Sequence, residues 1–303
     1  AIYTTKENET LEEAVVCLLK KKGMTIIFIS HKLNEVSYVA DHITVIRDGS
    51  TIETLDKKTD DISESRIIKG MVGREIADRF PKRPDVKIGD IRMEVKNWTV
   101  YHCLYPDRKI VDNVSFNVRK GEVVGISGLM GAGRSKLAIS LFGNSYGSKL
   151  EGDLIIDGEK VVFKNVRDAI DHKMAYVTDD RKGKGLILSK SIKENTTLAN
   201  LDSISKRKVI DKHKEVEVAE EYRKKLKTKT PSIEQNVGNL SGGNQQKVLL
   251  AKWMFAEPDI LILDEPTRGI DVGAKYEIYC IINQLVAEGK SVIMISSELP
   301  EVL

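Results

Sequence analysis

Two segments in the C-terminal third of the chain combine residue types that could bind and cleave a nucleoside triphosphate. Leu240–Gly243 is a glycine-rich turn whose backbone amides and one hydroxyl can meet a phosphate. The apolar run 260–263 stops at Asp264 and Glu265, so a buried strand delivers two carboxylates to its C-terminal edge. This pair of segments predicts that the chain handles nucleoside triphosphate, and that it does so between two lobes.

A third segment, Gly128–Ser135, matches the phosphate-loop pattern G-x-x-x-x-G-K-[ST] except at the lysine, which is replaced by Arg134. It follows a predicted strand at 121–127 and opens a predicted helix at 136–142, as the pattern requires. Glycines let the backbone wrap around phosphate oxygens, and the amides at a helix start favour negative charge. The alternative is a glycine-rich turn without a ligand, which the coincidence with the other two segments disfavours.

Arginine keeps the charge of lysine, but its planar fork cannot act as a compact point charge between two phosphates. We therefore expect a site that binds nucleotide and hydrolyses it poorly. Ser135 and Asp264 are the candidate Mg²⁺ ligands, and Glu265 is the candidate catalytic residue that orients or activates the attacking water. The candidate nucleotide-binding residues of the loop are Gly128, Gly131, Ala132, Gly133, Arg134, Ser135 and Lys136.

The composition narrows the class of protein. The 303 residues are enough for about two domains, and 41% hydrophobic and 31% charged residues are typical of a globular protein. A net charge of +3, from 48 basic and 45 acidic residues, gives no strong attraction to nucleic acid. Three separated cysteines argue against a disulfide framework or a zinc site. No apolar run approaches the roughly 20 residues that span a bilayer, so a membrane role would require a partner.

An internal repeat indicates the architecture. Residues 23–36 (GMTIIFISHKLNEV) and 289–302 (GKSVIMISSELPEV) align at a constant offset, since 289 − 23 and 302 − 36 both equal 266. Each copy joins a helix, an apolar β-branched run and a second helix start, which predicts a parallel α/β sheet. We therefore expect residues 1–75 to end a first domain, 76–90 to form a linker and 91–303 to form most of a second domain.

Two further patterns place elements in the second copy. Alternating apolar and polar residues predict strands at 91–100 and 111–118. Residues 190–236 are rich in Lys, Glu and small polar residues, with apolar residues at helical spacing between Val216 and Leu226. This spacing predicts a mostly helical subdomain packed beside the sheet.

These motifs resemble the ATP-binding subunits of ABC transporters. LSGGNQQ at 240–246 and ILILDEPTRGID at 260–271 carry the general likeness. TRGIDVGAK at 267–275 looks like the second nucleotide-binding domain of bacterial monosaccharide importers, whose ATPase subunit carries two such domains, and 97–106 looks like the xylose or multiple-monosaccharide branch. The resemblance implies an α/β P-loop NTPase fold with a mixed or parallel sheet, an antiparallel β subdomain and a helical subdomain. ATP and Mg²⁺ are the implied cofactors.

The resemblance also implies partners and a location. The partners are membrane permease subunits, an extracytoplasmic sugar-binding protein reached through them, and the missing N-terminal part of the first domain, with no nucleic acid. The location is cytoplasmic, peripheral on the inner face of the cell membrane. We expect both chain ends to be truncated and the isolated piece to be inactive. Which sugar is carried does not follow, because recognition lies in the permease and the binding protein.

Two other functions are weaker interpretations. A soluble ABC ATPase of the translation-factor or DNA-associated type would carry a long charged linker and two intact sites, unlike this chain. A non-catalytic module would describe this piece alone, because it lacks the phosphate loop of the first domain.

In the family, each ATP lies between the phosphate loop of one domain and the LSGG signature of the other. Ser241, Gly242 and Gly243 would therefore contact the nucleotide of the opposite site. A triphosphate held this way joins two domains, and its hydrolysis releases them. Tyr101 is the candidate for stacking on adenine, and a packing tyrosine is the alternative.

The resemblance exposes an asymmetry between the two domains. His31 stands where the family's γ-phosphate-sensing histidine lies, so it is a candidate catalytic residue, and the repeat puts Ser297 at that position in the second domain. Asp179 substitutes for the usual glutamine of the lid. The second domain thus departs from an active site at Arg134, Asp179 and Ser297. We expect hydrolysis at the site that pairs His31 with the signature of this chain.

In the full-length protein, His31→Ala is expected to cut ATP hydrolysis by roughly 100-fold, the range typical of a lost general acid–base or positioning group. Ser297→Ala should change it by less than about twofold, because its site contributes little turnover. Steady-state phosphate release measures both. Equal losses from the two variants would remove the asymmetry.

Overall fold

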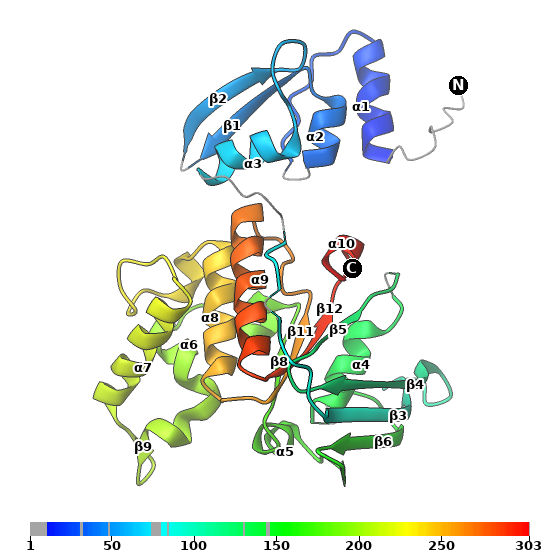
Figure 1. Ribbon diagram of the computed structural model, residues 1–303, viewed down its shortest axis with the longest axis vertical. Coiled ribbons are helices and arrows are strands. Elements are labelled where there is room, and N and C mark those ends of the chain that lie inside the picture. Colours follow the sequence, from blue (N-terminus) through cyan, green and yellow to red (C-terminus); the bar gives the residue numbers. More distant parts are fainter. Residues whose placement is uncertain are drawn as a thin grey trace. The chain divides into compact units, whose positions relative to one another are not determined.

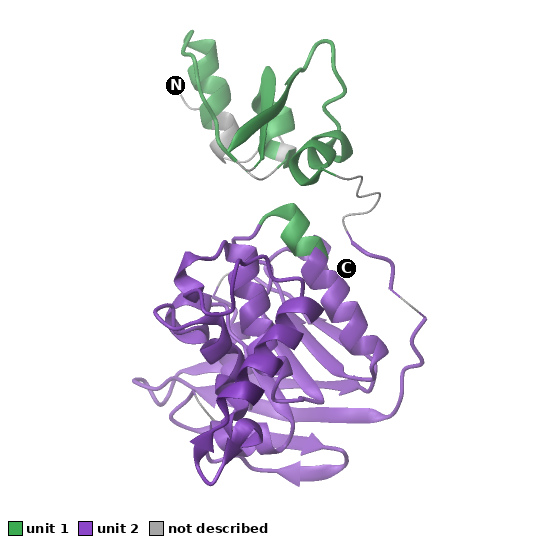
Figure 2. Cartoon of the chain, turned by 90° about the vertical axis from the view of Figure 1, so that its left-hand side faces the viewer, with its two compact units in different colours: residues 1–79, 271–276 green, residues 80–270, 277–303 purple. Residues whose placement is uncertain are grey.

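The computed structural model describes the following residues: 11–30, 33–47, 49–73, 80–83, 85–129, 131–143 and 146–302, with the backbone alone placed for 11–14 and 34. The chain forms two compact units, coloured in Figure 2. Unit 1 comprises residues 1–79 with 271–276, and unit 2 comprises 80–270 with 277–303. The first boundary falls within the predicted linker, and the assignment of these units to two domains of one family stays a prediction.

Unit 1 contains a two-stranded antiparallel sheet and a small apolar core. The core includes Leu33, Val45 and Ile67, each at most 3% exposed. The elements of this unit are α1 (Leu11–Lys21), α2 (Leu33–Val39), β1 (His42–Arg47), β2 (Ser50–Asp56) and α3 (Glu64–Val72) (Figure 1).

The strand predicted in the first repeat is wrong for this structure. Residues 24–30 form no strand, and Ile27 and Ile29 are 90% and 94% exposed. The equivalent β12 (Ser291–Ile295) has a parallel neighbour on each side, whereas no strand of the described part of unit 1 pairs with 24–30. A strand needs such a neighbour to complete its ladder of backbone hydrogen bonds, and the described part of unit 1 offers none to 24–30.

The centre of unit 2 is a four-stranded parallel sheet in the order β5-β12-β11-β8. Every residue of β8, β11 and β12 is buried, as their nearly continuous apolar sequences predict for a parallel sheet covered on both faces. The register pairs Asp264 with Ile295 and Ile295 with Ile126, so neighbouring strands end at the same edge. The bounds are β5 (Val123–Ile126), β8 (Met174–Val177), β11 (Ile260–Asp264) and β12 (Ser291–Ile295).

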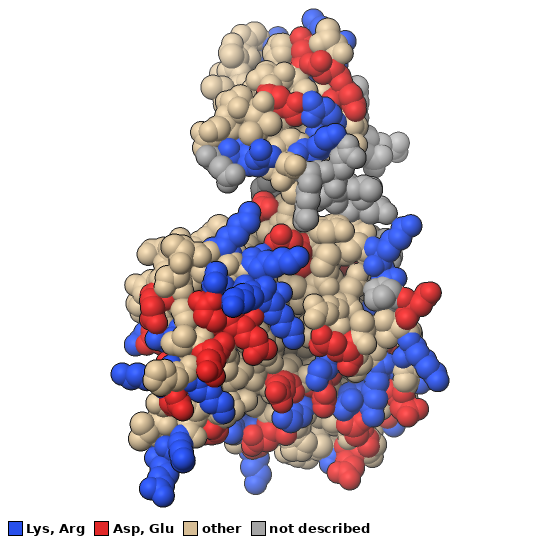
Figure 3. Space-filling model, turned by 60° about the vertical axis from the view of Figure 1, so that its left-hand side comes forward, with Lys and Arg blue, Asp and Glu red and all other residues tan. Residues whose placement is uncertain are grey.

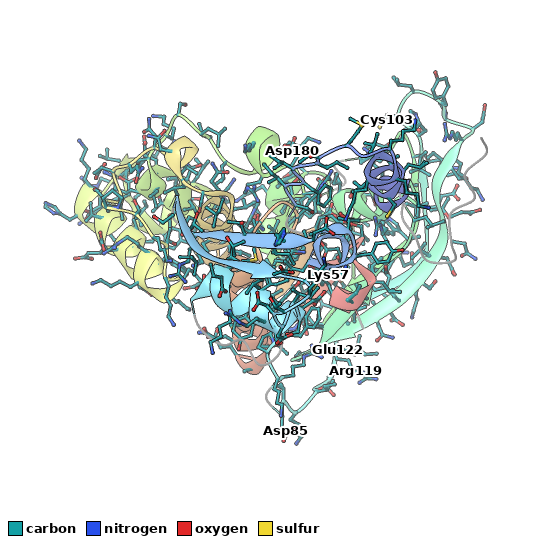
Figure 4. The ribbon with its side chains drawn as sticks, turned by 90° about the horizontal axis from the view of Figure 1, so that it is seen from above. Lys57, Asp85, Cys103, Arg119, Glu122 and Asp180 are labelled. Carbon is teal, nitrogen blue, oxygen red and sulfur yellow. The ribbon has the colours of Figure 1, made fainter. Side chains whose placement is uncertain are left out.

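A second, antiparallel sheet lies beside the first in the order β4-β3-β6-β7. Its strands are β3 (Ile91–Tyr101), β4 (Lys109–Arg119), β6 (Leu150–Ile156) and β7 (Glu159–Val161). The predicted strands at 91–100, 111–118 and 121–127 are confirmed, with bounds that shift by one to two residues. A tight turn links β4 to β5, in which the Arg119 amide donates to Glu122 Oε2 at 2.6 Å; both residues are labelled in Figure 4.

Helix α4 (Arg134–Leu141) joins the two sheets of unit 2. It contacts β11 of the parallel sheet and β4 of the antiparallel one, and Figure 1 shows it between them. One continuous apolar core therefore contains Val118 from β4, Leu137 from α4 and Ile262 from β11. The sequence predicted this helix at 136–142, and the structure starts it two residues earlier, at Arg134.

Both tryptophans of the chain contact the C-terminal half of α4 or the residue that caps it. Trp98 Nε1 donates to Ser140 Oγ at 2.9 Å in a buried hydrogen bond. Trp253 meets the ring of Phe142, which caps α4, edge-on at 5.5 Å between ring centroids. The Phe142 ring also lies 5.8 Å from that of Tyr176 on β8, so aromatic contacts connect three elements of unit 2.

The predicted helical subdomain is present in unit 2. It contains α6 (Ile192–Thr197), a 3₁₀ segment (Leu198–Ile204) and α7 (Lys212–Lys225). The apolar face of α7 is narrower than predicted, because Ala219 is fully buried while Val216 is 38% exposed. The remaining α-helices in the described part of unit 2 are α5 (Val166–Asp171), α8 (Gly242–Met254), α9 (Val272–Ala287, whose first turn belongs to unit 1) and α10 (Leu299–Val302).

The surface of unit 2 carries mixed charge. On the face in Figure 3, basic and acidic side chains are interspersed and do not gather into a patch of one sign. Within the described ranges, none of the helices combines the length and the apolar character that crossing a bilayer demands.

Gly143→Ala is expected to destabilise unit 2 by about 3 kcal/mol or more. Gly143 follows α4 with φ of 72°, and an added Cβ would lie 2.5 Å from the backbone nitrogen of Val166. Gly158 is the matched control, since its φ is 86° but nothing lies within 4 Å of an added Cβ. Gly158→Ala should cost only the backbone strain, about 1–2 kcal/mol. Urea denaturation compares the two, and equal costs would show that the close approach to Val166 is unimportant.

Candidate functional site

A cavity of ≈ 490 Å³ opens at the carboxyl edge of the parallel sheet of unit 2. Its volume lies within the range typical of small-molecule sites. It brings together residues of the phosphate loop and Glu265 of the acid pair, but no residue of the LSGG turn. The cavity is lined by His102, Arg108, Ile110, Gly131, Ala132, Gly133, Arg134, Ser135, Lys136, Tyr146, Asp179, Glu265, Arg268 and Ser297.

The glycine-rich loop reaches this cavity directly after β5. Gly131 and Gly133 have φ of 86° and 87°, which favours glycine at both positions. Gly133 also packs closely, because an added Cβ would lie 2.7 Å from the Ile110 carbonyl oxygen. Gly133 caps the start of α4, so the first amides of that helix face the loop. This is the geometry that holds an anion at a helix N-terminus.

Arg134, Glu265 and Ser297 form one cluster in the cavity. Arg134 Nη1 donates to the Ser296 carbonyl at 2.7 Å, and its Nη2 lies 3.5 Å from Glu265 Oε1. Ser297 Oγ donates to the other carboxylate oxygen, Glu265 Oε2, at 3.0 Å. The Arg134 and Glu265 side chains are only 13% and 12% exposed. Two of the three departures from an active site therefore contact the candidate catalytic carboxylate directly.

The backbone of Glu265 is itself unusual. Its φ is 48°, a left-handed conformation that non-glycine residues rarely adopt. Two hydrogen bonds hold it: the Glu265 amide donates to the Ile295 carbonyl at 2.9 Å, and its carbonyl accepts from the Arg268 amide at 3.1 Å. Strained backbone of this kind is concentrated at functional sites.

Asp264 lies beneath the cavity and is fully buried. Tyr176 Oη donates to its Oδ2 at 2.8 Å, whereas Oδ1 is buried without a hydrogen-bond partner. Burial raises the pKa of the Asp264 carboxyl, and the nearby Ser135 and Tyr176 hydroxyls oppose that rise. Burial also raises the pKa of Tyr176, which keeps this donor protonated. An unpaired carboxylate oxygen beside the Ser135 hydroxyl is a donor set that fits Mg²⁺, directly or through water.

Tyr176 is a site residue that the motifs did not indicate. It lies on β8, and the register sets it opposite Ile262, two residues before Asp264 on β11. Its hydroxyl orients the Asp264 carboxylate from the neighbouring strand. Only the pairing of β8 with β11 reveals this contact, since the two residues are 88 positions apart.

The charges lining the cavity favour an anionic ligand. Four permanent cations, Arg108, Arg134, Lys136 and Arg268, face two carboxylates, Asp179 and Glu265. The carboxylates are already near cations: Glu265 pairs with Arg134, and Asp179 Oδ2 lies 3.9 Å from Arg268 Nη1. A site with this excess of positive charge attracts a polyphosphate.

The LSGG turn lies outside this cavity. Ser241 caps the start of α8 and is exposed, while Gly242 is half-buried and Gly243 is buried. The Asn244 side chain donates to Ser241 Oγ at 3.0 Å, and its oxygen accepts from the Lys229 amide at 2.8 Å. The Ser241 hydroxyl is thus available at the surface beside the amides of a 13-residue helix.

The remaining predicted residues are located as follows. Gly128 belongs to the loop but does not line the cavity. Tyr101 ends β3 outside the cavity, where its hydroxyl donates to Glu151 at 3.4 Å. His31 lies outside the described residues, so its role stays a prediction.

The family model described as ABC transporter matches residues 111–268, which run from β4 through the phosphate loop and the LSGG turn to just past the end of β11. Among solved structures, a nucleotide-free ATP-binding cassette from an ABC transporter covers 70% of this chain, with a TM-score of 0.60 and 21% identity. At that identity the likeness shows the fold alone.

Similar curated proteins are named for sugar transport. The L-arabinose transport ATP-binding protein AraG of Geobacillus stearothermophilus is 59% identical over 94% of this chain. The xylose import ATP-binding protein XylG of Thermoanaerobacter pseudethanolicus is 54% identical over 94% of it, and the ribose import ATP-binding protein RbsA of Bacillus subtilis is 45% identical over 100%. The chain spans 55%, 56% and 59% of the lengths of these relatives, respectively.

Asp264→Asn is expected to raise the free energy of unfolding of the unliganded chain near neutral pH. Because burial raises the folded-state pKa of Asp264, its ionised form is disfavoured in the folded chain. That cost grows as pH rises from the unfolded-state pKa of about 4 through the raised pKa, and it is absent below about pH 3, where both states are protonated. Urea denaturation at both pH values measures the gain, which should be present near neutral pH and absent at the lower pH.

Asp259→Asn is the control for this prediction. Asp259 lies just before β11 but pairs with Lys290 at 3.0 Å and with Arg92 at 3.3 Å. Its amide variant loses both ion pairs, so it should give no gain near neutral pH. A lower free energy of unfolding for Asp264→Asn near neutral pH would contradict the prediction.

Proposed function

The chain belongs to the ABC transporter family, whose members bind ATP, and we propose that it is part of the energy-coupling subunit of a sugar importer. Such a subunit hydrolyses ATP to move a monosaccharide through a separate membrane permease. One observation carries the proposal: a single cavity gathers the glycine-rich loop, Glu265, Asp179 and Ser297 at the carboxyl edge of a parallel sheet.

The site in unit 2 would bind Mg²⁺ and ATP with the loop amides, Arg134 and Lys136 around the phosphates. Ser135 and Asp264 would hold the metal, which neutralises negative charge on the phosphates when bound. The unpaired Asp264 Oδ1 supports this assignment, because a buried carboxylate oxygen needs a cation, a water or a donor. Tyr176 would keep the carboxylate oriented.

This site would turn over slowly. Glu265 could orient a water only with a free oxygen, yet one oxygen faces Arg134 and the other accepts from Ser297. Arg134, in turn, must leave the Ser296 carbonyl and Glu265 before it can contact a phosphate. Glu265 and the nucleotide therefore compete for the same guanidinium. The cost of that exchange weakens nucleotide binding at this site.

The exposed Ser241 at the start of α8 would serve a second nucleotide. It lies outside the cavity that contains Arg134, and its hydroxyl and helix amides reach the surface together. With a phosphate loop from the first nucleotide-binding domain, this turn would complete the competent site. His31 would act there as the residue that senses the γ-phosphate.

The partners and location follow from the same proposal. The permease supplies the membrane passage and an extracytoplasmic binding protein delivers the sugar, so this subunit would lie at the inner face of the cell membrane. Arabinose, xylose and ribose, the sugars in the names of the relatives, are all monosaccharides of similar size, which supports that substrate class. Each of those relatives carries transport or import in its name, which disfavours a translation or DNA-associated role.

The chain is expected to bind Mg²⁺-ATP and to release almost no phosphate. Arg134→Ala should weaken binding about tenfold or more, because a charge-assisted hydrogen bond to phosphate is lost. Arg223→Ala is the control, since this arginine pairs with Glu220 on α7, away from the cavity. Equilibrium binding of a fluorescent ATP analogue and a phosphate-release assay make the two measurements. Robust turnover by the chain alone, or unweakened binding by Arg134→Ala, would contradict the proposal.

In the full-length protein, Arg134→Ala distinguishes the contributions of the two nucleotide sites. Arg134→Ala should weaken nucleotide binding at one site while most of the turnover remains. Abolished turnover would show that the site in unit 2 is catalytic.

A further inference from the structure

The cavity is also lined by an aromatic ring, Tyr146, that has no role in the motifs or in the proposed function. Tyr146 lines the cavity between α4 and β6, whereas Tyr101, the adenine candidate from the sequence, does not. The Tyr101 ring instead has Lys149 Nζ 5.3 Å from its centroid, and its hydroxyl donates to Glu151. The two tyrosine rings therefore have different surroundings, and of the two only Tyr146 lines the cavity.

The backbone of Tyr101 helps to position Tyr146. The Ser148 amide donates to the Tyr101 carbonyl at 3.2 Å, and the Tyr101 amide donates to the Lys149 carbonyl at 3.1 Å. These bonds hold the segment after Tyr146 against the end of β3. Tyr101 therefore supports this segment through its backbone, whereas the ring that lines the cavity belongs to Tyr146.

Lys136 connects Tyr146 to the phosphate loop. Lys136, one residue after the candidate metal ligand Ser135, places Nζ 4.4 Å from the centre of the Tyr146 ring. A cation at this distance makes a favourable contact with the ring face. Lys136 therefore bridges the loop, where a triphosphate would lie, and the ring, where an attached base would lie.

The loop after β3 also lines the cavity that contains Tyr146. The His102 amide donates to the Arg108 carbonyl at 2.8 Å, and both side chains line the cavity. The Leu104 amide donates to His102 Nδ1 at 3.0 Å, so the neutral ring carries its proton on Nε2. Cys103 of this loop is labelled in Figure 4. The loop thus adds one ring and one guanidinium, both of which can contact a planar heterocycle.

We propose that Tyr146 forms the aromatic surface for the base of the bound nucleotide, with His102 and Arg108 flanking it, and that Tyr101 does not contact the base. The inference rests on the proposed nucleotide site and specifies its base end. A purine stacked on Tyr146 would stay within one cavity with its phosphates on Gly131–Lys136. A base on the Tyr101 ring would lie outside that cavity.

The test compares ATP with inorganic tripolyphosphate, which carries the phosphates without a base, by titration calorimetry with Mg²⁺. Tyr146→Leu should weaken ATP binding about tenfold, the effect of losing one base–aromatic stack. It should leave tripolyphosphate binding within about twofold, because its phosphate contacts remain. Tyr146→Phe should retain ATP affinity, since stacking needs the ring and not the hydroxyl. Tyr38→Leu, in α2 of unit 1, is the control and should change neither affinity.

Tyr101→Leu decides between the two tyrosines. The proposal predicts that it changes ATP affinity by less than about twofold. A selective loss of ATP binding in Tyr101→Leu, with Tyr146→Leu silent, would overturn the proposal. Equal affinity of the unmodified chain for ATP and tripolyphosphate would also overturn it, while leaving the phosphate site intact. Binding of neither ligand would overturn the proposed function and this inference with it.

A second measurement does not depend on the folding of any variant. The unmodified chain is labelled with 8-azido-ATP under light, and the modified peptide is mapped. Label on the peptide that contains Tyr146 supports the proposal. Label confined to other peptides would overturn it.

Discussion

The parallel pairing of β5, β12 and β11 is the constraint on which the site depends. Neighbouring parallel strands end at one edge of a sheet, and open α/β sheets bind ligands outside those ends. The register puts Asp264 opposite Ile295 and Ile295 opposite Ile126. The phosphate loop after β5, the two acids at the end of β11 and the serines after β12 therefore converge. A slip of one residue between any two of these strands would separate them.

Once these groups converge, their charges must be balanced without a ligand. The guanidinium of Arg134 and the carboxylate of Glu265 satisfy each other, and Ser296 and Ser297 complete their contacts. Asp264 differs from Glu265, because one of its carboxylate oxygens is buried without a hydrogen-bond partner. The two adjacent acids thus differ in what they can do. Glu265 is occupied by protein groups, and Asp264 retains an oxygen for a cation.

The glycine-rich loop and the acid pair lie at strand ends, as the sequence predicted because both are local patterns; their roles stay predictions. The sequence also predicted the parallel sheet, the antiparallel strands and the helical subdomain of unit 2. It failed for residues 24–30, whose apolar pattern matches β12 but for which the described part of the chain supplies no neighbouring strand. It could not find Tyr176 or Tyr146, because no local motif marks them. Their positions depend on strand pairing and on a loop held to β3, which involve residues far apart in the chain.

The placement of the two tryptophans gives the chain an optical reporter of its own. Trp98 is hydrogen-bonded to Ser140 of α4, and Trp253 abuts Phe142 at the end of that helix. Indole emission is sensitive to small changes in packing and polarity around the ring. Any displacement of α4 when its N-terminus meets a ligand would pass to both indoles. Intrinsic fluorescence could therefore follow occupancy in real time, with no dye attached and no residue of the cavity altered.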